Sequence, residues 1–379
     1  MIYVDNASTT KPSEAVIEAM VSCMRDTWGN PSSVHRFGQR AADQLQTART
    51  LIARRIGARS SEIYFTSGGS EADNQAIISA AVNGAARGKK HIISTRIEHH
   101  AVLHTLKKLE KQGFEVELID VSENGIVSPV QLENSIRNDT CLVTVMYANN
   151  EIGSIQPIAE IGRICKEKGV LFHTDAVQAV GHLPIDVNSQ NIDMLSCSAH
   201  KFHGPKGIGF LYARKGVKIT NVIEGGGQEY GKRGGTENLP AIVGMAVALE
   251  ESRVHMKENT VKTVKLRDKL INGLLGIPGC VLNGDAEKRS PGNVNVSFSG
   301  VEGESLLLLL NEKGICASTG SACTSGSVEP SHVLMAIGRS VAMAHSSIRF
   351  SLCEENTEEE IKYIVESVAD AVSFLRSER

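Results

Sequence analysis

The chain has 379 residues, of which 41% are hydrophobic and 22% are charged, and its formal net charge is −3. A chain of this length can bury a large core, and its near-neutral charge lacks the basic surface that nucleic-acid binding requires. Eight cysteines without a C-x-x-C pair exclude a disulfide scaffold and a zinc ribbon, and they indicate a reducing compartment. The N-terminus lacks the pattern of a secretion signal, and the longest apolar run, 306–310, is too short to span a bilayer. We therefore expect a cytoplasmic protein that binds neither nucleic acid nor a membrane.

Short apolar runs alternate with helix-like segments between about residues 60 and 215, which predicts a mostly parallel sheet covered on both faces. The predicted strands are 62–66, 91–95, 116–119, 142–147, 170–173, 194–197 and 209–212. A helix is predicted from about 240 to 275, because apolar residues recur there with helical spacing. After residue 278 the pattern changes to isolated strands, 294–298 and 348–352, with amphipathic helices. We expect an α/β fold with a large seven-stranded domain, 14–257, and a smaller α+β domain formed by 1–13 and 258–379.

Polar clusters follow several of the predicted strands. They are 67–70, Glu98 with His99, 149–151, Asp175 with Gln178, and His200 with Lys201. In open α/β sheets the ligand crevice lies at the carboxyl ends of the strands. We therefore expect these clusters to converge in one site.

Lys201 directly follows a predicted strand, within the sequence SAHKFHGPKG (198–207). A lysine amine that is partly removed from water can lose its proton and attack a carbonyl, as a Schiff base with pyridoxal phosphate requires. A surface lysine at the end of a strand is the alternative, because most lysines are exposed.

The sequence SGGSEA (67–72) follows a predicted strand and opens a helix. Its glycines let backbone N–H groups approach an anion, Ser70 can donate a hydrogen bond, and a helix N-terminus favours negative charge. The segment is either a phosphate-binding turn or an ordinary helix cap.

Asp175 ends a predicted strand, and Gln178 follows three residues later. A carboxylate there can keep a pyridine nitrogen protonated, and Gln178 can then bind the phenolic oxygen of the ring. A helix-capping aspartate is the alternative.

His99 can stack on a cofactor ring or be an ordinary core histidine. His100 and His104 would share a helix face and suggest zinc, but the sequence shows no third ligand.

Cys323 lies in STGSACTSGS (318–327), a run of small polar residues that is unsuited to burial. Such a thiol is either a nucleophile that travels or an incidental cysteine.

Arg349 alternates with apolar neighbours on a predicted strand. Its guanidinium can either bind a carboxylate there or face solvent. The glycine-rich loop 225–236 lacks the Ser or Thr that a P-loop needs for magnesium, but it offers Thr236 to a phosphate.

Together these motifs resemble the NifS/IscS-type cysteine desulfurases, which belong to class V of the fold-type I pyridoxal-phosphate (PLP) enzymes. The resemblance covers nearly the whole chain, and it rests on YVDNASTT (3–10), GNPSSVH (29–35), NNEIG (149–153), SAHKFHGPKG (198–207), GSACTS (320–325) and IRFS (348–351). It implies a homodimer that converts L-cysteine to L-alanine and carries the sulfur as a persulfide on Cys323. An acceptor protein would then receive the sulfur for iron–sulfur cluster assembly or for thiolation of tRNA or a cofactor.

The resemblance also implies a role for each site residue. Lys201 would hold PLP as a Schiff base and shuttle protons, and His99 would stack on the ring and act as a second acid–base group. The other cofactor contacts would come from Gly69, Ser70, Asn150, Asp175, Gln178, Ser198, His200 and, from the neighbouring subunit, Thr236. Arg349, assisted by Asn150, would bind the substrate carboxylate. Cys323 would take the sulfur and briefly ligate a nascent iron–sulfur cluster.

Two other functions remain open on the sequence. Another class V enzyme, such as an aminotransferase or a selenocysteine lyase, would share Lys201 and Asp175 but would need no travelling thiol. A non-catalytic sulfur- or metal-handling protein would use the eight cysteines and would not take up PLP.

Overall fold

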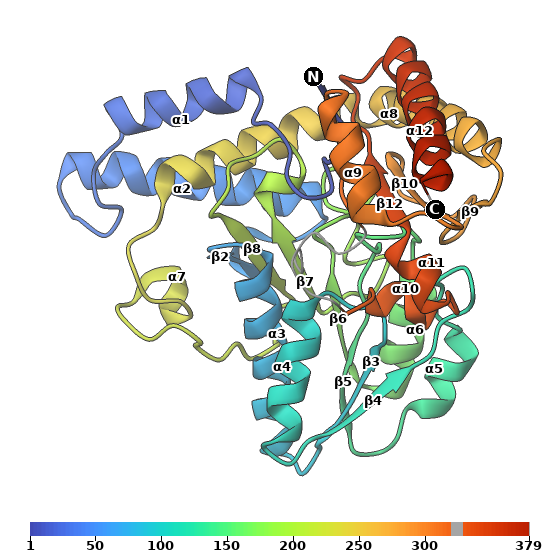
Figure 1. Ribbon diagram of the computed structural model, residues 1–379. Helices are drawn as coiled ribbons and strands as arrows, with labels where there is room; N and C mark the ends of the chain where they lie inside the picture. The colour runs from blue at the N-terminus through green and yellow to red at the C-terminus, as the bar shows by residue number, and fades with distance from the viewer. Residues whose placement is uncertain (320–328, 379) are drawn as a thin grey trace.

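The computed structural model describes residues 1–319 and 329–378. Within them, seven strands form one sheet in the order β2-β8-β7-β6-β5-β3-β4, in which β8 runs antiparallel to both of its neighbours and the other pairs are parallel (Figure 1). The strands are β2 (Ile63–Thr66), β3 (His91–Thr95), β4 (Glu115–Ile119), β5 (Thr140–Thr144), β6 (Leu171–Asp175), β7 (Met194–Ser198) and β8 (Gly209–Ala213). The predicted mostly parallel sheet is confirmed.

The helices of this part of the chain cover both faces of the sheet. They are α1 (Glu14–Asp26), α2 (Arg36–Arg55), α3 (Gly69–Ala85), α4 (His100–Glu110), α5 (Pro129–Ser135), α6 (Ile158–Lys168), α7 (Gln228–Gly231) and α8 (Leu239–Leu275). Successive strand residues point to opposite faces. Val143 and Leu195 therefore join the core beneath α2, α6 and the first part of α8, whereas Leu142 and Met194 join the core beneath α3 and α4.

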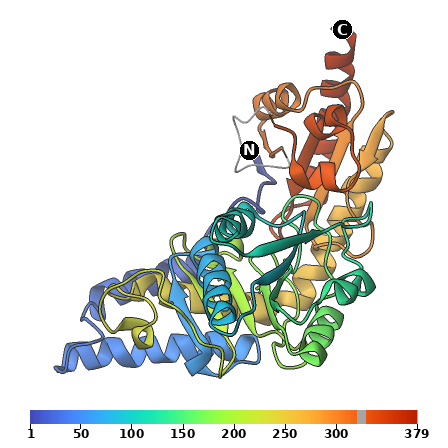
Figure 2. The same cartoon turned by 90° about the horizontal axis from the view of Figure 1, so that it is seen from below.

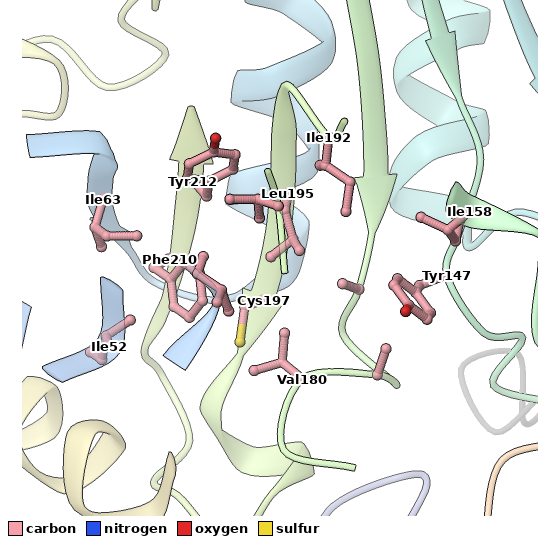
Figure 3. Close-up of a cluster of buried hydrophobic side chains, with 14 of the residues drawn as sticks. Ile52, Ile63, Tyr147, Ile158, Val180, Ile192, Leu195, Cys197, Phe210 and Tyr212 are labelled. Atoms are coloured by element: carbon pink, nitrogen blue, oxygen red, sulfur yellow. The ribbon is translucent and has the colours of Figure 1, made fainter. Parts of the chain in front are cut away.

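Cys197 shows how completely the first of these cores excludes water. Its side chain lies among buried apolar residues that include Leu195 and Phe210 (Figure 3). Burial raises the pKa of its thiol well above the usual value. This cysteine therefore stays protonated and serves packing rather than chemistry.

The C-terminal part builds a second core beside the large sheet, as the orange and red segments show in Figure 2. Its strands are β9 (Cys280–Leu282), β10 (Asn293–Phe298) and β12 (Ser347–Ser351) in an antiparallel sheet, and β1 (Ile2–Tyr3) with β11 (Ile315–Cys316) in a parallel pair. Its helices are α9 (Gly303–Glu312), α10 (His332–Ala336), α11 (Val341–His345) and α12 (Glu358–Ser377). None of the helices in the described part of the chain has the length and apolar character that a membrane span requires.

Helix α8 contributes to both cores. Its residues from Ala241 to Leu249 pack beneath the large sheet, whereas Leu266 and Leu270 pack in the second core. The expected boundary at residue 257 falls between these two sets, inside an unbroken helix. Val4 also belongs to the second core, which agrees with grouping residues 1–13 with the smaller domain. The division into 14–257 and 1–13 with 258–379 remains a prediction.

Candidate active site

A cavity of about 360 Å³ opens at the carboxyl edge of the large sheet. Its lining includes most of the residues that the sequence analysis singled out, namely Gly69, Ser70, His99, Asn150, Asp175, Gln178, Ser198, His200, Lys201 and Arg349. The strands β6 and β7 end here, and α3 and α4 begin here. The expected convergence of the strand-end clusters is therefore observed. Thr236 does not line this cavity, and Cys323 lies outside the described residues.

Lys201 ends the short turn that follows β7, and its side chain is partly buried. Its Nζ donates hydrogen bonds to the carbonyl oxygens of Ala7 at 2.7 Å and Ser8 at 2.8 Å. Gln178 donates to the same carbonyl of Ala7 at 3.0 Å. The imidazole of His182 donates to the backbone oxygen of Lys201 at 2.8 Å. The N-terminal segment thus binds the amine of Lys201, and His182 binds its backbone.

Asp175 is the last residue of β6 and is buried at the cavity wall. Its Oδ1 accepts a hydrogen bond from the backbone N–H of Val177 at 2.9 Å. Burial raises the pKa of Asp175, while His99, the Val177 N–H and Lys201 act in the opposite direction. These three neighbours favour the carboxylate form, which a protonated ring nitrogen would need as its partner.

His99 is the N-cap residue of α4, and its Nδ1 accepts a hydrogen bond from the backbone N–H of Ala101 at 3.1 Å. This contact places the ring proton of neutral His99 on Nε2. The donor atoms of Asp73, His99 and Asp175 all lie within 4.8 Å of one another, a spacing that a metal ion would also accept. Lys201 and Arg349 line the same cavity, and their positive charge opposes a metal ion there.

The start of α3 offers an anion cradle. Gly69 has no room for a side chain, because a Cβ there would lie 2.5 Å from a methyl carbon of Val177. The backbone N–H groups of Gly69 and Ser70 belong to the first turn, which has no carbonyl partner within the helix. Ser198 and His200 line the same cavity, and a Cβ at Gly69 would lie 3.6 Å from Ser198 Cβ.

His200 enters this cradle as a neutral ring. Burial, together with the charges of Lys201 and Lys206, lowers the pKa of His200 to about 4. Its Nδ1 lies 3.2 Å from the Thr9 hydroxyl. A neutral ring that accepts this hydroxyl at Nδ1 carries its proton on Nε2 and can donate it to a phosphate oxygen.

Arg349 lies on β12 and is 1% exposed. Its Nη1 donates to the backbone oxygen of Asn150 at 3.0 Å, and its Nη2 donates to Asp5 Oδ1 at 2.9 Å and to Ser8 Oγ at 2.7 Å. Its Nε is buried without a hydrogen-bond partner among the described residues. The guanidinium thus presents an unused donor at the wall of the cavity.

The histidine pair considered for zinc does share a helix face, since the rings of His100 and His104 stack with their centroids 5.1 Å apart. His332 lies against His100 at 4.8 Å and donates from Nε2 to the backbone oxygen of Glu98 at 2.9 Å. Burial and the neighbouring histidines lower the pKa of His100. In the described part of the chain this cluster does not form a set of three donors with metal-ligand spacing, so the structure does not support the zinc hypothesis.

Three residues of the site were not identified from the sequence: Asp73 and His332, which line the cavity, and Asp5, which contacts the lining residue Arg349. Asp73 shares a face of α3 with Gly69 and Ala76, and an acidic residue on an otherwise small, apolar helix face was the available signal. Asp5 and His332 come from segments far from the other site residues, and no local pattern indicated their position.

Comparisons with known proteins agree with this geometry. The aminotransferase class-V family model matches residues 2–364. A cysteine desulfurase IscS from Methanosarcina thermophila is 53% identical over 376 residues, which cover 99% of this chain and 93% of that protein. A solved structure described as a NifS-like protein has a TM-score of 0.93 and 41% identity, covering 98% of this chain and 99% of the other. Another, described as SspA in complex with cysteine, has a TM-score of 0.83 and 38% identity, covering 93% of this chain and 99% of the other.

The chain therefore belongs to the class-V aminotransferase family and, within it, to the cysteine desulfurases of the NifS/IscS type. This confirms the resemblance that the motifs indicated.

Proposed function

We propose that this chain converts L-cysteine to L-alanine in the cavity around Lys201, with PLP as its cofactor. The observation that carries this proposal is the meeting of an amine, a buried carboxylate and a buried guanidinium in one cavity, on Lys201, Asp175 and Arg349. The similar structure solved with cysteine supports the choice of substrate.

The donor set of the cavity fits PLP. Lys201 would bind its aldehyde carbon, Asp175 its ring nitrogen and Gln178 its phenolic oxygen, with His99 over the ring and Asn150 at its edge. The phosphate would be held by Gly69, Ser70, Ser198 and His200. When bound, PLP supplies an electron sink for the charge that develops on the substrate Cα. A side chain at position 69 would collide with Val177, which lines the same cavity.

Lys201 is the group that moves the proton of the substrate Cα, because its amine belongs to the lining of the cavity. His99, whose ring belongs to the same cavity, serves as the second acid–base group. Arg349 binds the substrate carboxylate, assisted by Asn150, and so orients the Cβ–S bond away from the cavity floor.

Cys323 receives the sulfur. Its thiolate attacks the sulfur of the substrate, the Cβ–S bond breaks, Cβ takes up a proton as alanine forms, and Cys323 keeps the sulfur as a persulfide. Cys323 follows Ser318 by five residues, or at most about 17 Å of chain. The backbone of Ser318 is hydrogen-bonded to that of Arg349, which keeps the start of the cysteine segment beside the cavity.

The persulfide would pass to a protein acceptor thiol for iron–sulfur cluster assembly or for thiolation of tRNA or a cofactor, and Cys323 would briefly ligate the nascent cluster. The seven cysteines in the described part of the chain are free thiols, which supports a reducing, cytoplasmic setting.

A homodimer would complete the site. Trp28 and Val34, in the connection between α1 and α2, are 66% and 91% exposed, and Trp28 stacks on the half-exposed Phe37 with ring centroids 5.1 Å apart. We propose that a second copy covers this apolar patch and that each copy offers Thr236 to the phosphate of the other. Sedimentation analysis tests this part of the proposal. We expect the wild type to be a dimer and W28D to dimerise more weakly.

The central test mixes the purified protein, PLP and ³⁵S-labelled L-cysteine without a reducing thiol. We expect the wild type to form alanine and to retain bound ³⁵S. C323A should retain no bound ³⁵S, and K201A should give neither alanine nor bound ³⁵S. K215A, which changes an exposed lysine, is the matched control. Alanine formation by K201A at the wild-type rate, or keto-acid-dependent amino transfer faster than sulfur release, would overturn the proposal.

A further inference from the structure

Asp73 places a second buried carboxyl group beside Asp175. It lies on α3, is 1% exposed, lines the cavity, and has a carboxyl oxygen within 4.8 Å of the donor atoms of Asp175 and His99. Its Oδ1 has no hydrogen-bond partner among the described residues. A buried carboxylate with an unpartnered oxygen is costly, so its charge state needs an explanation.

The charges that act most on Asp73 are those of other acidic groups. His173, on β6, has Nε2 at 3.7 Å from Asp73, but this ring is engaged by Thr144 at Nδ1 and by Ser196 at Nε2, at 2.8 and 2.9 Å. Burial lowers the pKa of His173 to about 3, so it is neutral at physiological pH. The other titratable neighbours are Glu98 and Asp175, which are acidic, and His99.

Asp73 and Asp175 differ in what stabilises a negative charge. Burial raises the pKa of Asp175 as well, but Asp175 accepts the Val177 N–H and lies near His99 and Lys201, which all favour its ionised form. Burial and then the charge of Asp175 raise the pKa of Asp73 strongly, and the Ser196 hydroxyl offsets this in part. Two buried carboxyl groups this close together do not both ionise. The proton binds to the carboxyl group whose negative charge is less stabilised by its neighbours.

We propose that Asp73 is a positioning residue that remains a neutral carboxylic acid, so that the negative charge of the pair stays on Asp175. A neutral Asp73 also provides an O–H donor beside Asp175, which holds that carboxylate in place toward the cavity. This proposal rests on the proposed function for the identity of the cofactor whose ring nitrogen Asp175 faces.

The direct test is infrared spectroscopy of the full-length protein at neutral pH, with and without PLP, comparing the wild type with D73N. We expect the difference spectrum to show loss of a protonated-carboxyl C=O band that shifts in D2O. Loss of carboxylate bands instead would overturn the proposal. E98Q, which removes another buried carboxyl, is the matched control and should remove a separate band.

A kinetic and spectral test separates positioning from folding. D73A should lower kcat about tenfold with little change in the KM for cysteine, and should shift the pH titration of the bound-cofactor absorbance. D73N, which keeps the shape and the neutral charge, should recover most of that loss in both readouts. Equal defects in D73A and D73N would overturn the proposal, and thermal unfolding of both variants identifies any that fail to fold. A protonated Asp73 in a protein that does not take up PLP would refute the proposed function but not the charge state of Asp73.

Discussion

Arg349 and Asp5 lie 344 residues apart in the sequence, yet Nη2 of Arg349 donates to Oδ1 of Asp5 at 2.9 Å. The first residues of the chain therefore hold the guanidinium that we propose as the binding group for the substrate carboxylate. Ser8, from the same segment, accepts from Arg349 and offers its carbonyl to Lys201. One short stretch thus holds both Arg349 and Lys201, the groups that we propose bind the substrate and react with it.

Replacing Arg349 should weaken substrate binding more than cofactor binding. A charge-assisted pair of hydrogen bonds is worth about 3 kcal/mol, so R349A should lose about 100-fold in kcat/KM for cysteine, mostly through KM. The visible absorbance of bound PLP should persist. R349K keeps the charge but not the planar fork, and it should recover only part of the loss. R163A, on the exposed face of α6, is the control, and an unchanged KM in R349A would contradict the assignment.

Glu98 should make the protein less stable as the pH rises. Burial raises the pKa of Glu98 to about 8, well above its unfolded value. Between about pH 4.5 and 8 the folded protein therefore keeps a proton that the unfolded chain has lost, and the free energy of unfolding falls as pH increases. E98Q removes this dependence. The stability of E98Q relative to the wild type should grow by a few kcal/mol from pH 5 to 8 and then level off, as urea unfolding would show. A constant difference over this range would contradict a protonated Glu98.

The loop that carries Thr236 depends on a buried ion pair between Arg49 and Glu229. Two hydrogen bonds of 2.7 and 2.8 Å join the side chains, and Glu229 also accepts the Phe65 N–H at 2.9 Å. Glu229 has a positive φ of 47°, a conformation that non-glycine residues adopt only when it is held in place.

E229A should lower the free energy of unfolding by about 3 kcal/mol, because it leaves Arg49 buried without its partner. E224A, which changes an exposed acidic residue of the same loop, should have little effect. Urea denaturation measures both, and equal stability of the two variants would show that the ion pair does not hold the loop.

His203 and Glu354 join the segment after Lys201 to the end of β12. His203 Nε2 lies 3.6 Å from Glu354 Oε1, and His203 Nδ1 donates to the carbonyl oxygen of Lys11 at 2.9 Å. Pairing with His203 lowers the pKa of Glu354 to about 2. Burial alone would lower the pKa of His203. The hydrogen bond and the negative charge of Glu354 act more strongly in the opposite direction, so the pKa of His203 is raised above its usual value.

This pair should stabilise the protein most between about pH 4.5 and 6.5. The Glu354 contribution is lost as the pH falls through the folded pKa of Glu354, and the His203 contribution is lost as the pH rises through the raised pKa of His203. Because Glu354 is about one-third exposed, E354Q should cost only about 1 kcal/mol near pH 6 and less at pH 9. Thermal unfolding across this range checks the prediction, and a larger effect at pH 9 than at pH 6 would contradict it.

The sequence by itself determined the seven strands, to within about three residues at each end, because their apolar runs are short, separate and bounded by polar clusters. It also determined that these clusters meet, because strand ends of a parallel sheet share one edge. Lys201, Asp175 and His99 all follow from that rule.

Only the tertiary structure decided the charges and partners in the cavity. Asp73 looks like any helical aspartate until burial removes its water and brings Asp175 close to it. Asp5 looks like a solvent-exposed residue until it pairs with Arg349, a contact that no local pattern encodes. The physical reason is that desolvation and long-range electrostatics depend on which segments pack together, and residue types and spacing do not specify that packing.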